Sequence, residues 1–369
     1  MTAAMRPQVS DSIRWLAALV RAPLTGEAPP AVAVDRDFVE FAIRRHRVGP
    51  LLYVAQAAWN SESAHAKLLA VHYLDNARRF ASSELFLKDL ADKFCTEKIP
   101  WLTFKGVTLA RQLYPEPNWR QVNDVDVLVP PDRFGDALQM MRRSGLSIIH
   151  TRRDPDFWVE KCMARLAKDV MLRDERLGLN VELHRRLFFA RAEENQAVLL
   201  RNAFSPHLSP AGSDMPSPPV GAALALYLLL HGANSRWFRM KWLVDLLAIL
   251  ARMGEVDVHA IADTADQLRA TVSVKAGLRI FAWVFGDAAL GPAASWLNET
   301  AGRDKIEARA RIFLHALEQL DATGPAREGD RLDSLDVYYA IAESVSYRSA
   351  ALLRGGAWIA LRALCKILP

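Results

Sequence analysis

The chain has 369 residues, of which 51% are hydrophobic, so it can bury a large core, and its length predicts two or three domains rather than one. Lysine and arginine number 47 against 42 aspartates and glutamates. The formal net charge of +5 is a mild excess for a chain of this size and does not by itself indicate nucleic-acid binding.

The cysteines and the apolar runs indicate the compartment. Cys95, Cys162 and Cys365 are far apart and odd in number, which predicts neither a disulfide framework nor a zinc site. No secretory signal pattern is recognisable at the N-terminus. The longest apolar run, residues 220–230, falls short of the roughly 20 residues that span a bilayer. We therefore expect a cytoplasmic protein without stable membrane insertion.

The first 80 residues predict an N-terminal helical region. Apolar side chains recur at helical spacing in residues 11–20, 36–59 and 64–97, with proline and glycine between the segments. The last of these helices ends before Pro100 and leads into the next predicted domain.

Residues 81–205 predict a small mixed sheet with helices. Short apolar segments alternate there with turn residues and helical patterns. The predicted elements are, in order, a strand at 101–104, a helix at 107–113, a strand at 122–129, a helix from 130 to 143, strands at 146–151 and 169–173, a turn at 174–178 and a strand at 179–184.

The rest of the chain predicts a linker and a helical domain. Five prolines fall between residues 205 and 219, which predicts a linker at 206–219 because proline continues neither a helix nor a sheet ladder. Residues 220–369 then predict an all-helical domain, with helices at 222–230, 242–253, 258–285, 305–320 and 335–368. The basic and apolar residues 347–366 fit either a helix at a membrane surface or a core or oligomer-contact helix. The predicted fold class is α+β.

The strand at 122–129 carries two acids at an unusual place. Asp124 and Asp126 share one face of the strand, while Val125, Val127 and Val129 point to the other. Two carboxylates roughly 6.5 Å apart repel each other unless a cation lies near them. A hard divalent ion shared with phosphates is the simplest candidate. An acid pair at an exposed strand edge is the alternative.

The strand at 179–184 supplies a third acid. Glu182 and His184 share one face, and Val181 and Leu183 share the other. If this strand lies beside the first, three carboxylates converge, as two-metal displacement chemistry requires. The competing acids are Glu160, Asp169 and Glu175.

These pieces together resemble a known family. The residues that carry the resemblance are Phe104-Lys105-Gly106, Leu109-Ala110, Leu113-Tyr114-Pro115, Asn123 to Val129 and Val181-Glu182-Leu183-His184. They resemble the bacterial uncharacterised nucleotidyltransferase family of the DNA polymerase β-type superfamily, over about residues 82–250. The resemblance implies a nucleotidyltransferase core in which Asp124, Asp126 and Glu182 bind Mg²⁺, with Mn²⁺ as a possible substitute, and act in catalysis.

The resemblance also implies a nucleotide-binding turn. Lys105 and Gly106 would lie against the phosphates of an NTP such as ATP, where glycine admits a close backbone approach and lysine supplies a charge. The superfamily's turn is typically Gly-Ser, and no serine follows Gly106 here. Thr108 is the candidate to supply the hydroxyl.

Further polar residues are candidates for the nucleotide or acceptor pocket. Arg120, just before the acidic strand, can reach a phosphate, and His184 can orient a substrate or serve the structure. The segment 231–245 also resembles the family, so that Arg239, Lys241 and Asp245 either complete the pocket or belong to a packing helix with paired charges.

The predicted activity is Mg²⁺-dependent transfer of a nucleoside monophosphate from an NTP to a hydroxyl or phosphate acceptor, with release of pyrophosphate. One alternative is a non-catalytic nucleotide- or partner-binding module with the same fold. Another is a toxin-like transferase that modifies tRNA or protein. The acceptor, the preferred NTP and the oligomeric state are left open by the sequence.

Overall fold

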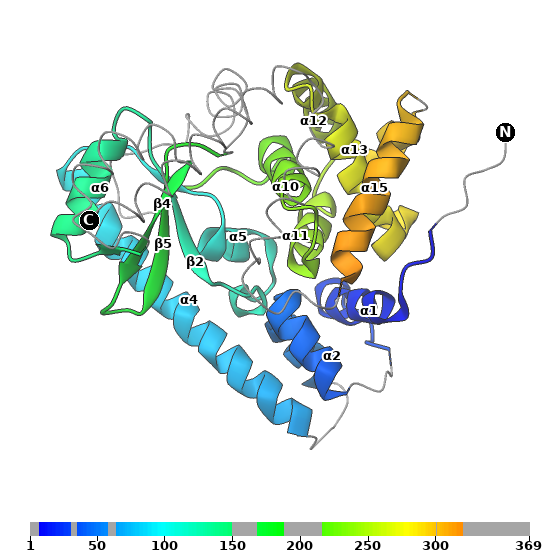
Figure 1. Cartoon of the computed structure of the whole chain (residues 1–369), viewed down its shortest axis with the longest axis horizontal. Helices are drawn as coiled ribbons and strands as arrows, with labels where there is room; N and C mark the ends of the chain where they lie inside the picture. Colours follow the sequence, from blue (N-terminus) through cyan, green and yellow to red (C-terminus); the bar gives the residue numbers. More distant parts are fainter. Residues whose placement is uncertain are drawn as a thin grey trace, which may run out of the picture. The chain divides into compact units, whose positions relative to one another are not determined.

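The structure is a computed structural model, and it describes residues 7–30, 35–57, 64–149, 168–187, 216–299 and 301–319 (Figure 1). The chain divides into two compact units. We call the first the helical unit; its described residues come from 7–77, 111–121 and 220–319. We call the second the sheet unit; its described residues come from 78–110, 122–187 and 216–219.

The described part of the sheet unit contains one five-stranded mixed sheet. Its strands lie in the order β1-β2-β5-β4-β3, where β2 and β5 are parallel and the other neighbours are antiparallel. The strands are β1 (Leu102–Thr103), β2 (Asp124–Leu128), β3 (Ser147–Ile148), β4 (Asp169–Asp174) and β5 (Leu179–His184). The predicted α+β class with a mixed sheet is thereby confirmed.

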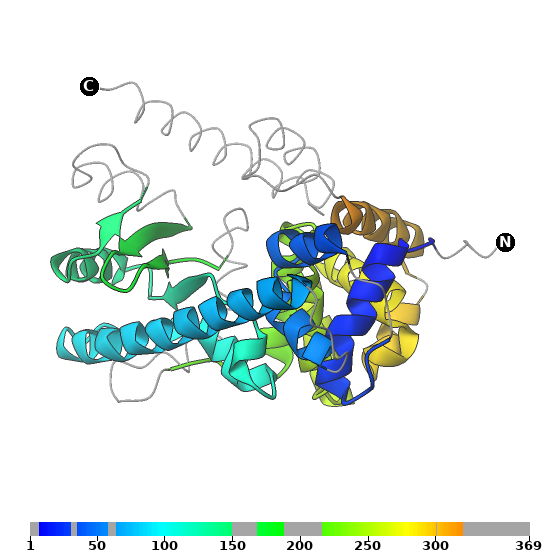
Figure 2. The same ribbon diagram turned by 90° about the horizontal axis from the view of Figure 1, so that it is seen from below.

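One face of this sheet packs on helices. Val125, Val127 and Val129 belong to a single buried cluster with side chains of α4 (Ala64–Thr96) and α6 (Phe134–Arg143). The helix α4 is 33 residues long, and its length is evident in Figure 2. Because side chains alternate along a strand, the acids of β2 lie on the opposite face, away from this apolar core.

The helical unit has no strand among its described residues. A tight packing point lies at Trp237, which is fully buried. A Cβ atom added at Gly232 would lie 2.4 Å from the Trp237 ring, so a larger residue there would displace the ring, and one added at Gly277 would lie 3.0 Å from it, which is a tight contact. The α-helices that lie wholly within this unit are α1 (Asp11–Thr25), α2 (Arg36–Glu40), α3 (Gly49–Ala57), α10 (Ala222–Asn234), α11 (Met240–Leu250), α12 (Glu255–Gln267), α13 (Thr271–Phe285), α14 (Ala293–Asn298) and α15 (Arg303–Glu318).

Some predicted helix bounds were wrong. The helix predicted at 258–285 is two helices, α12 and α13, because Arg269 adopts a left-handed conformation with φ of 49° and turns the chain. The helical pattern predicted within 36–59 includes α2 and α3 as separate helices, and Arg47 has φ of 55° between them. Of the strand predicted at 146–151, the described residues 146–149 contain β3 alone. The predicted helix at 335–368, most of the linker at 206–219, Cys162, Cys365 and Glu160 lie outside the described residues.

Within the described ranges, no helix combines the length and the apolar character that crossing a membrane requires.

A buried histidine makes the stability of the helical unit depend on pH. The ring of His46 is fully buried, and its Nδ1 accepts a hydrogen bond from the backbone N–H of Met240 at 3.0 Å. Burial, and then the charges of Arg45 and Arg239, lower the pKa of His46 from 6.5 to about 3. The folded protein therefore keeps this ring neutral where the unfolded chain protonates it.

We expect the free energy of unfolding to fall as the pH drops from 6.5 toward 3, because only the unfolded state binds the proton of His46 in this range. The loss from this group is about 2 kcal/mol at pH 5. His46→Gln retains an acceptor for Met240 but cannot titrate. Urea unfolding of both proteins from pH 7 to pH 4 measures the difference; parallel pH profiles would contradict the assignment.

Candidate active site

The acids predicted from the sequence meet on one face of the sheet. β2 and β5 are parallel neighbours, and their register places Asp126 beside Glu182 and Asp124 beside Asn180. Side-by-side residues of neighbouring strands point to the same face, so Asp126 and Glu182 project together. The side chain of Asp126 is 2% exposed and that of Glu182 is 18% exposed, while Asp124 is half-buried. Asp124 follows the same alternation along β2 as Asp126.

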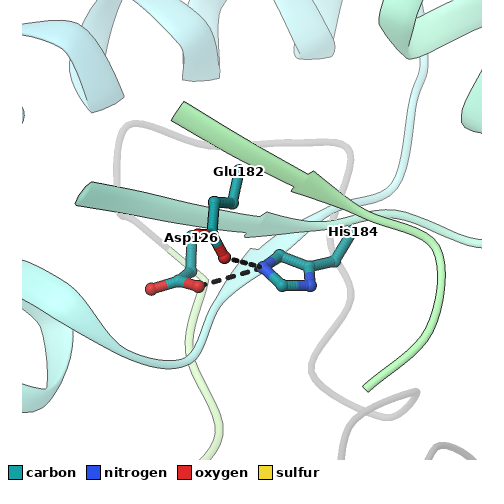
Figure 3. A group of neighbouring side chains, drawn as sticks. All are labelled: Asp126, Glu182 and His184. Carbon is teal, nitrogen blue, oxygen red and sulfur yellow. Dashed lines mark hydrogen bonds and ion pairs between the residues drawn. The ribbon is translucent and has the colours of Figure 1, made fainter. Parts of the chain in front are cut away.

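His184 directs one ring nitrogen toward both carboxylates (Figure 3). Its Nε2 is 2.9 Å from Asp126 Oδ1 and 3.2 Å from Glu182 Oε2. The ring is 1% exposed, and Phe104 packs edge-on against it with the ring centroids 5.3 Å apart. His184 therefore has a fixed place at the centre of the acidic face.

Lys105 provides a compensating positive charge. Its Nζ is 2.7 Å from Asp126 Oδ1, and its side chain is 14% exposed. Burial by itself raises the pKa of Asp126, but the Lys105 ammonium and the hydrogen bond from His184 outweigh it and hold that pKa well below its usual value. Asp126 is therefore ionised at neutral pH. The structure places Lys105 against the acid rather than on the solvent side of the turn.

A second ion pair lies on the other side of His184. Asp169 is the register partner of His184 on the antiparallel strand β4. Its Oδ2 is 3.6 Å from His184 Nδ1 and 2.8 Å from Lys168 Nζ. Burial and the Lys168 charge each lower the pKa of His184, but hydrogen bonds to Asp126 and Glu182 and the charge of Asp169 raise it above its usual value. Sequence reasoning considered Asp169 only as a rival third acid, and it did not consider Lys168.

The glycine turn lies directly against the acidic strand. Gly106 begins α5 (Gly106–Leu113) with φ of 59°, and a Cβ atom added there would lie 3.2 Å from the backbone oxygen of Asp124. Thr108 is buried, and its hydroxyl is hydrogen-bonded to that of Thr103 on β1. Thr108 lies in the first turn of α5, and a contact of its hydroxyl with a phosphate stays a prediction.

Gly106→Ala should destabilise the protein by about 1–2 kcal/mol, because an L side chain disfavours the left-handed conformation that Gly106 adopts. Gly135→Ala is the matched control. Gly135 lies in α6, and a Cβ atom added there meets nothing within 4 Å, so helix propensity should leave that variant equally stable or stabilise it by about 0.5 kcal/mol. Urea unfolding measures both, and equal effects would contradict the role of the turn.

The remaining predicted pocket residues lie in the helical unit. Arg120 binds Asp245 through Nε at 2.8 Å and through its terminal nitrogen at 2.9 Å, and Tyr114 donates to the same carboxylate at 2.7 Å. The guanidinium of Arg239 lies 4.6 Å from the Phe238 ring centroid. Lys241 is buried. A nucleotide role for Arg120, Arg239 or Lys241 stays a prediction.

The donors on the acidic face fit a divalent metal ion. One ligand atom each from Asp126, Glu182 and His184 lies within 4.8 Å of the others, the only such group within the ranges described. Carboxylate oxygens suit Mg²⁺ and Mn²⁺, and imidazole nitrogen suits transition metals. The sequence predicted Asp124 where this group contains His184. The period-two alternation that placed Glu182 also placed His184 on the same face.

A mixed sheet that carries paired acids on the face opposite its apolar core, with a lysine and a glycine turn beside them, is consistent with a nucleotidyltransferase core. Residues 34–286 match the family described as "Uncharacterised nucleotidyltransferase". The chain belongs to this family. The comparisons found no matching curated protein and no matching solved structure.

Proposed function

We propose that the protein transfers a nucleoside monophosphate from an NTP to a hydroxyl or phosphate acceptor and releases pyrophosphate. The observation that carries the proposal is the pairing of Asp126 with Glu182 on neighbouring parallel strands, next to the glycine turn. Membership of the family supports a transferase and an NTP substrate. Mg²⁺ as the physiological ion, ATP as the first nucleotide to test and a cytoplasmic location are parts of the proposal.

The residues have separate roles in this reaction. Asp124, Asp126 and Glu182 would hold the divalent metal, which would supply the charge that neutralises the triphosphate and polarises its α-phosphorus. Gly106 admits the phosphates close to the backbone, and Lys105 adds a positive charge beside them. An oxygen of the acceptor forms the new bond to the α-phosphorus. The bond from that phosphorus to the oxygen that joins it to the β-phosphate breaks, and pyrophosphate leaves. Glu182 favours loss of the acceptor proton.

The test is pyrophosphate release by the full chain. The protein is incubated with each of the four NTPs and with Mg²⁺ or Mn²⁺, with and without cell extract, alongside Asp124→Asn and Asp126→Asn. Release that requires both metal and aspartates supports the transferase and names its nucleotide. Release that is unchanged in both variants contradicts the assignment of the site.

The second candidate is a nucleotide-binding module without turnover. It is favoured by the ion pair between Lys105 and Asp126 and by the turn that lacks a serine after Gly106. Calorimetry with each NTP separates the two functions. Binding of an NTP without pyrophosphate release, under every metal and extract condition, favours the module.

A further inference from the structure

The position of His184 indicates which metal ion the site prefers, because carboxylates alone suit many divalent ions. His184 is the one residue of the described three-residue group that offers a nitrogen ligand, and its Nε2 lies within 3.2 Å of an oxygen from each acid. The orientation of the ring therefore brings a nitrogen to both carboxylates, which packing alone does not require. The same position lets Nε2 act as a third donor to an ion that Asp126 and Glu182 share.

The opposite side of the ring has the partner that metal-binding histidines use. Nδ1 of His184 is buried and has no hydrogen-bond partner among the described residues, yet Asp169 Oδ2 lies 3.6 Å from it. Metal-ligating histidines almost always donate their second ring N–H to a carboxylate or carbonyl, which fixes the nitrogen that binds the metal. A closure of roughly 0.7 Å brings Nδ1 and Asp169 to an ordinary hydrogen-bond distance.

Asp169 is itself held in place for this role. Lys168 Nζ lies 2.8 Å from its Oδ2, and the β4–β5 register sets Asp169 directly beside His184. Lys168, Asp169 and His184 thus form a chain of contacts that ends at Nε2. In the metal-bound site, the proton of the neutral ring would lie on Nδ1, toward Asp169, and leave Nε2 as the donor.

We propose that His184 Nε2 is a ligand of the metal at this site, that Asp169 is the positioning residue for its ring, and that the site binds Mn²⁺ more tightly than Mg²⁺. This inference rests on the proposed function, because it uses the same two carboxylates. The preference follows from the donor set: Mg²⁺ favours an all-oxygen shell, whereas an imidazole nitrogen favours first-row transition metals.

The test is electron spin-echo spectroscopy of the full chain loaded with Mn²⁺. A coordinated imidazole couples the ¹⁴N nucleus to the manganese electrons, and protein grown with ¹⁵N-histidine replaces that signal with the ¹⁵N pattern. This comparison needs no substitution. His184→Gln should remove the signal, and Asp126→Asn should remove Mn²⁺ binding itself.

Titration of the wild type and the variants with MnCl₂ and MgCl₂ measures their affinities for the two ions and completes the test. His184→Gln should weaken Mn²⁺ binding about tenfold or more and Mg²⁺ binding less. Asp169→Asn should weaken Mn²⁺ binding by about 10–100-fold while the histidine signal persists. Glu175→Gln, an exposed acid in the turn between β4 and β5, is the control and should change neither affinity.

The outcomes separate the two proposals. Mn²⁺ that binds through Asp126 without any histidine coupling overturns the role of His184 and leaves the proposed function standing. Equal affinities of the wild type for Mn²⁺ and Mg²⁺ overturn the preference. Failure of Mn²⁺ to bind, or equal binding by Asp126→Asn, overturns the metal site of the proposed function and this inference with it.

Discussion

We expect Asp126→Asn to lower the rate of nucleotidyl transfer by about 10³-fold or more. Asp126 is buried, ionised and faces Glu182, and in the proposed function its charge would hold the metal that offsets the charge of the triphosphate. Such an ion supplies several kcal/mol of transition-state stabilisation. Each 1.36 kcal/mol corresponds to a tenfold change in rate, so losing about 4 kcal/mol gives the expected factor.

The fold should survive this substitution. The replacement amide has the size of the carboxylate, and its oxygen can still accept hydrogen bonds from His184 and Lys105. Because Lys105 and His184 stabilise the charge that is lost, the variant should unfold at a lower temperature than the wild type while keeping the fold. Circular dichroism and thermal unfolding check the fold, and pyrophosphate release checks the rate. Glu175→Gln, in the exposed turn, should retain full activity, and normal turnover by Asp126→Asn would remove Asp126 from the mechanism.

The face that carries the site could be predicted because it depends on local geometry. The alternation of valine and aspartate along 124–129 fixes which residues point to the core with α4 and α6, and it places the acids on the opposite face. The same rule placed His184 beside Glu182. The sequence of five or six strand residues is enough to predict which side chains share a face.

The partners across the sheet could not be predicted in the same way. The contact of Asp126 with His184 joins residues 58 positions apart, and it exists only because β2 and β5 pair in parallel in one particular register. A shift of one residue would turn Glu182 to the other face. The ion pair of Lys105 with Asp126 and the place of Asp169 beside His184 also depend on pairing between distant segments.

In the helical unit, the partner of Arg120 could likewise not be predicted from the sequence. Arg120 was considered as a phosphate ligand because it precedes the acidic strand in the sequence. In the structure it pairs with an aspartate 125 positions away, and the side chains are 4% and 1% exposed. An arginine near a turn carries no signal that distinguishes a substrate contact from a buried ion pair, because its partner is set by tertiary packing.

Asp245→Ala should destabilise the helical unit by about 3–5 kcal/mol, since it leaves the buried Arg120 charge without its carboxylate. Arg120 donates to both carboxylate oxygens of Asp245, at 2.8 and 2.9 Å, and such bidentate pairs are stronger than single contacts. Tyr114→Phe removes the third contact to the same carboxylate and should cost only about 1.5 kcal/mol, the lower end for a hydrogen bond to a charged group. Urea unfolding of each variant measures these values.

The double variant Arg120→Met, Asp245→Leu distinguishes a structural pair from a substrate contact. When both charges of a buried pair are replaced by apolar groups, the cost is far below the sum of the single costs, so we expect a strongly non-additive cycle. Arg120→Lys adds the second criterion, because lysine keeps the charge and loses the fork that binds both carboxylate oxygens. If Arg120 is structural, this variant unfolds at lower urea with an unchanged KM for the NTP. If KM rises while stability holds, Arg120 contacts the nucleotide, and Asp245 is then the residue that aims it.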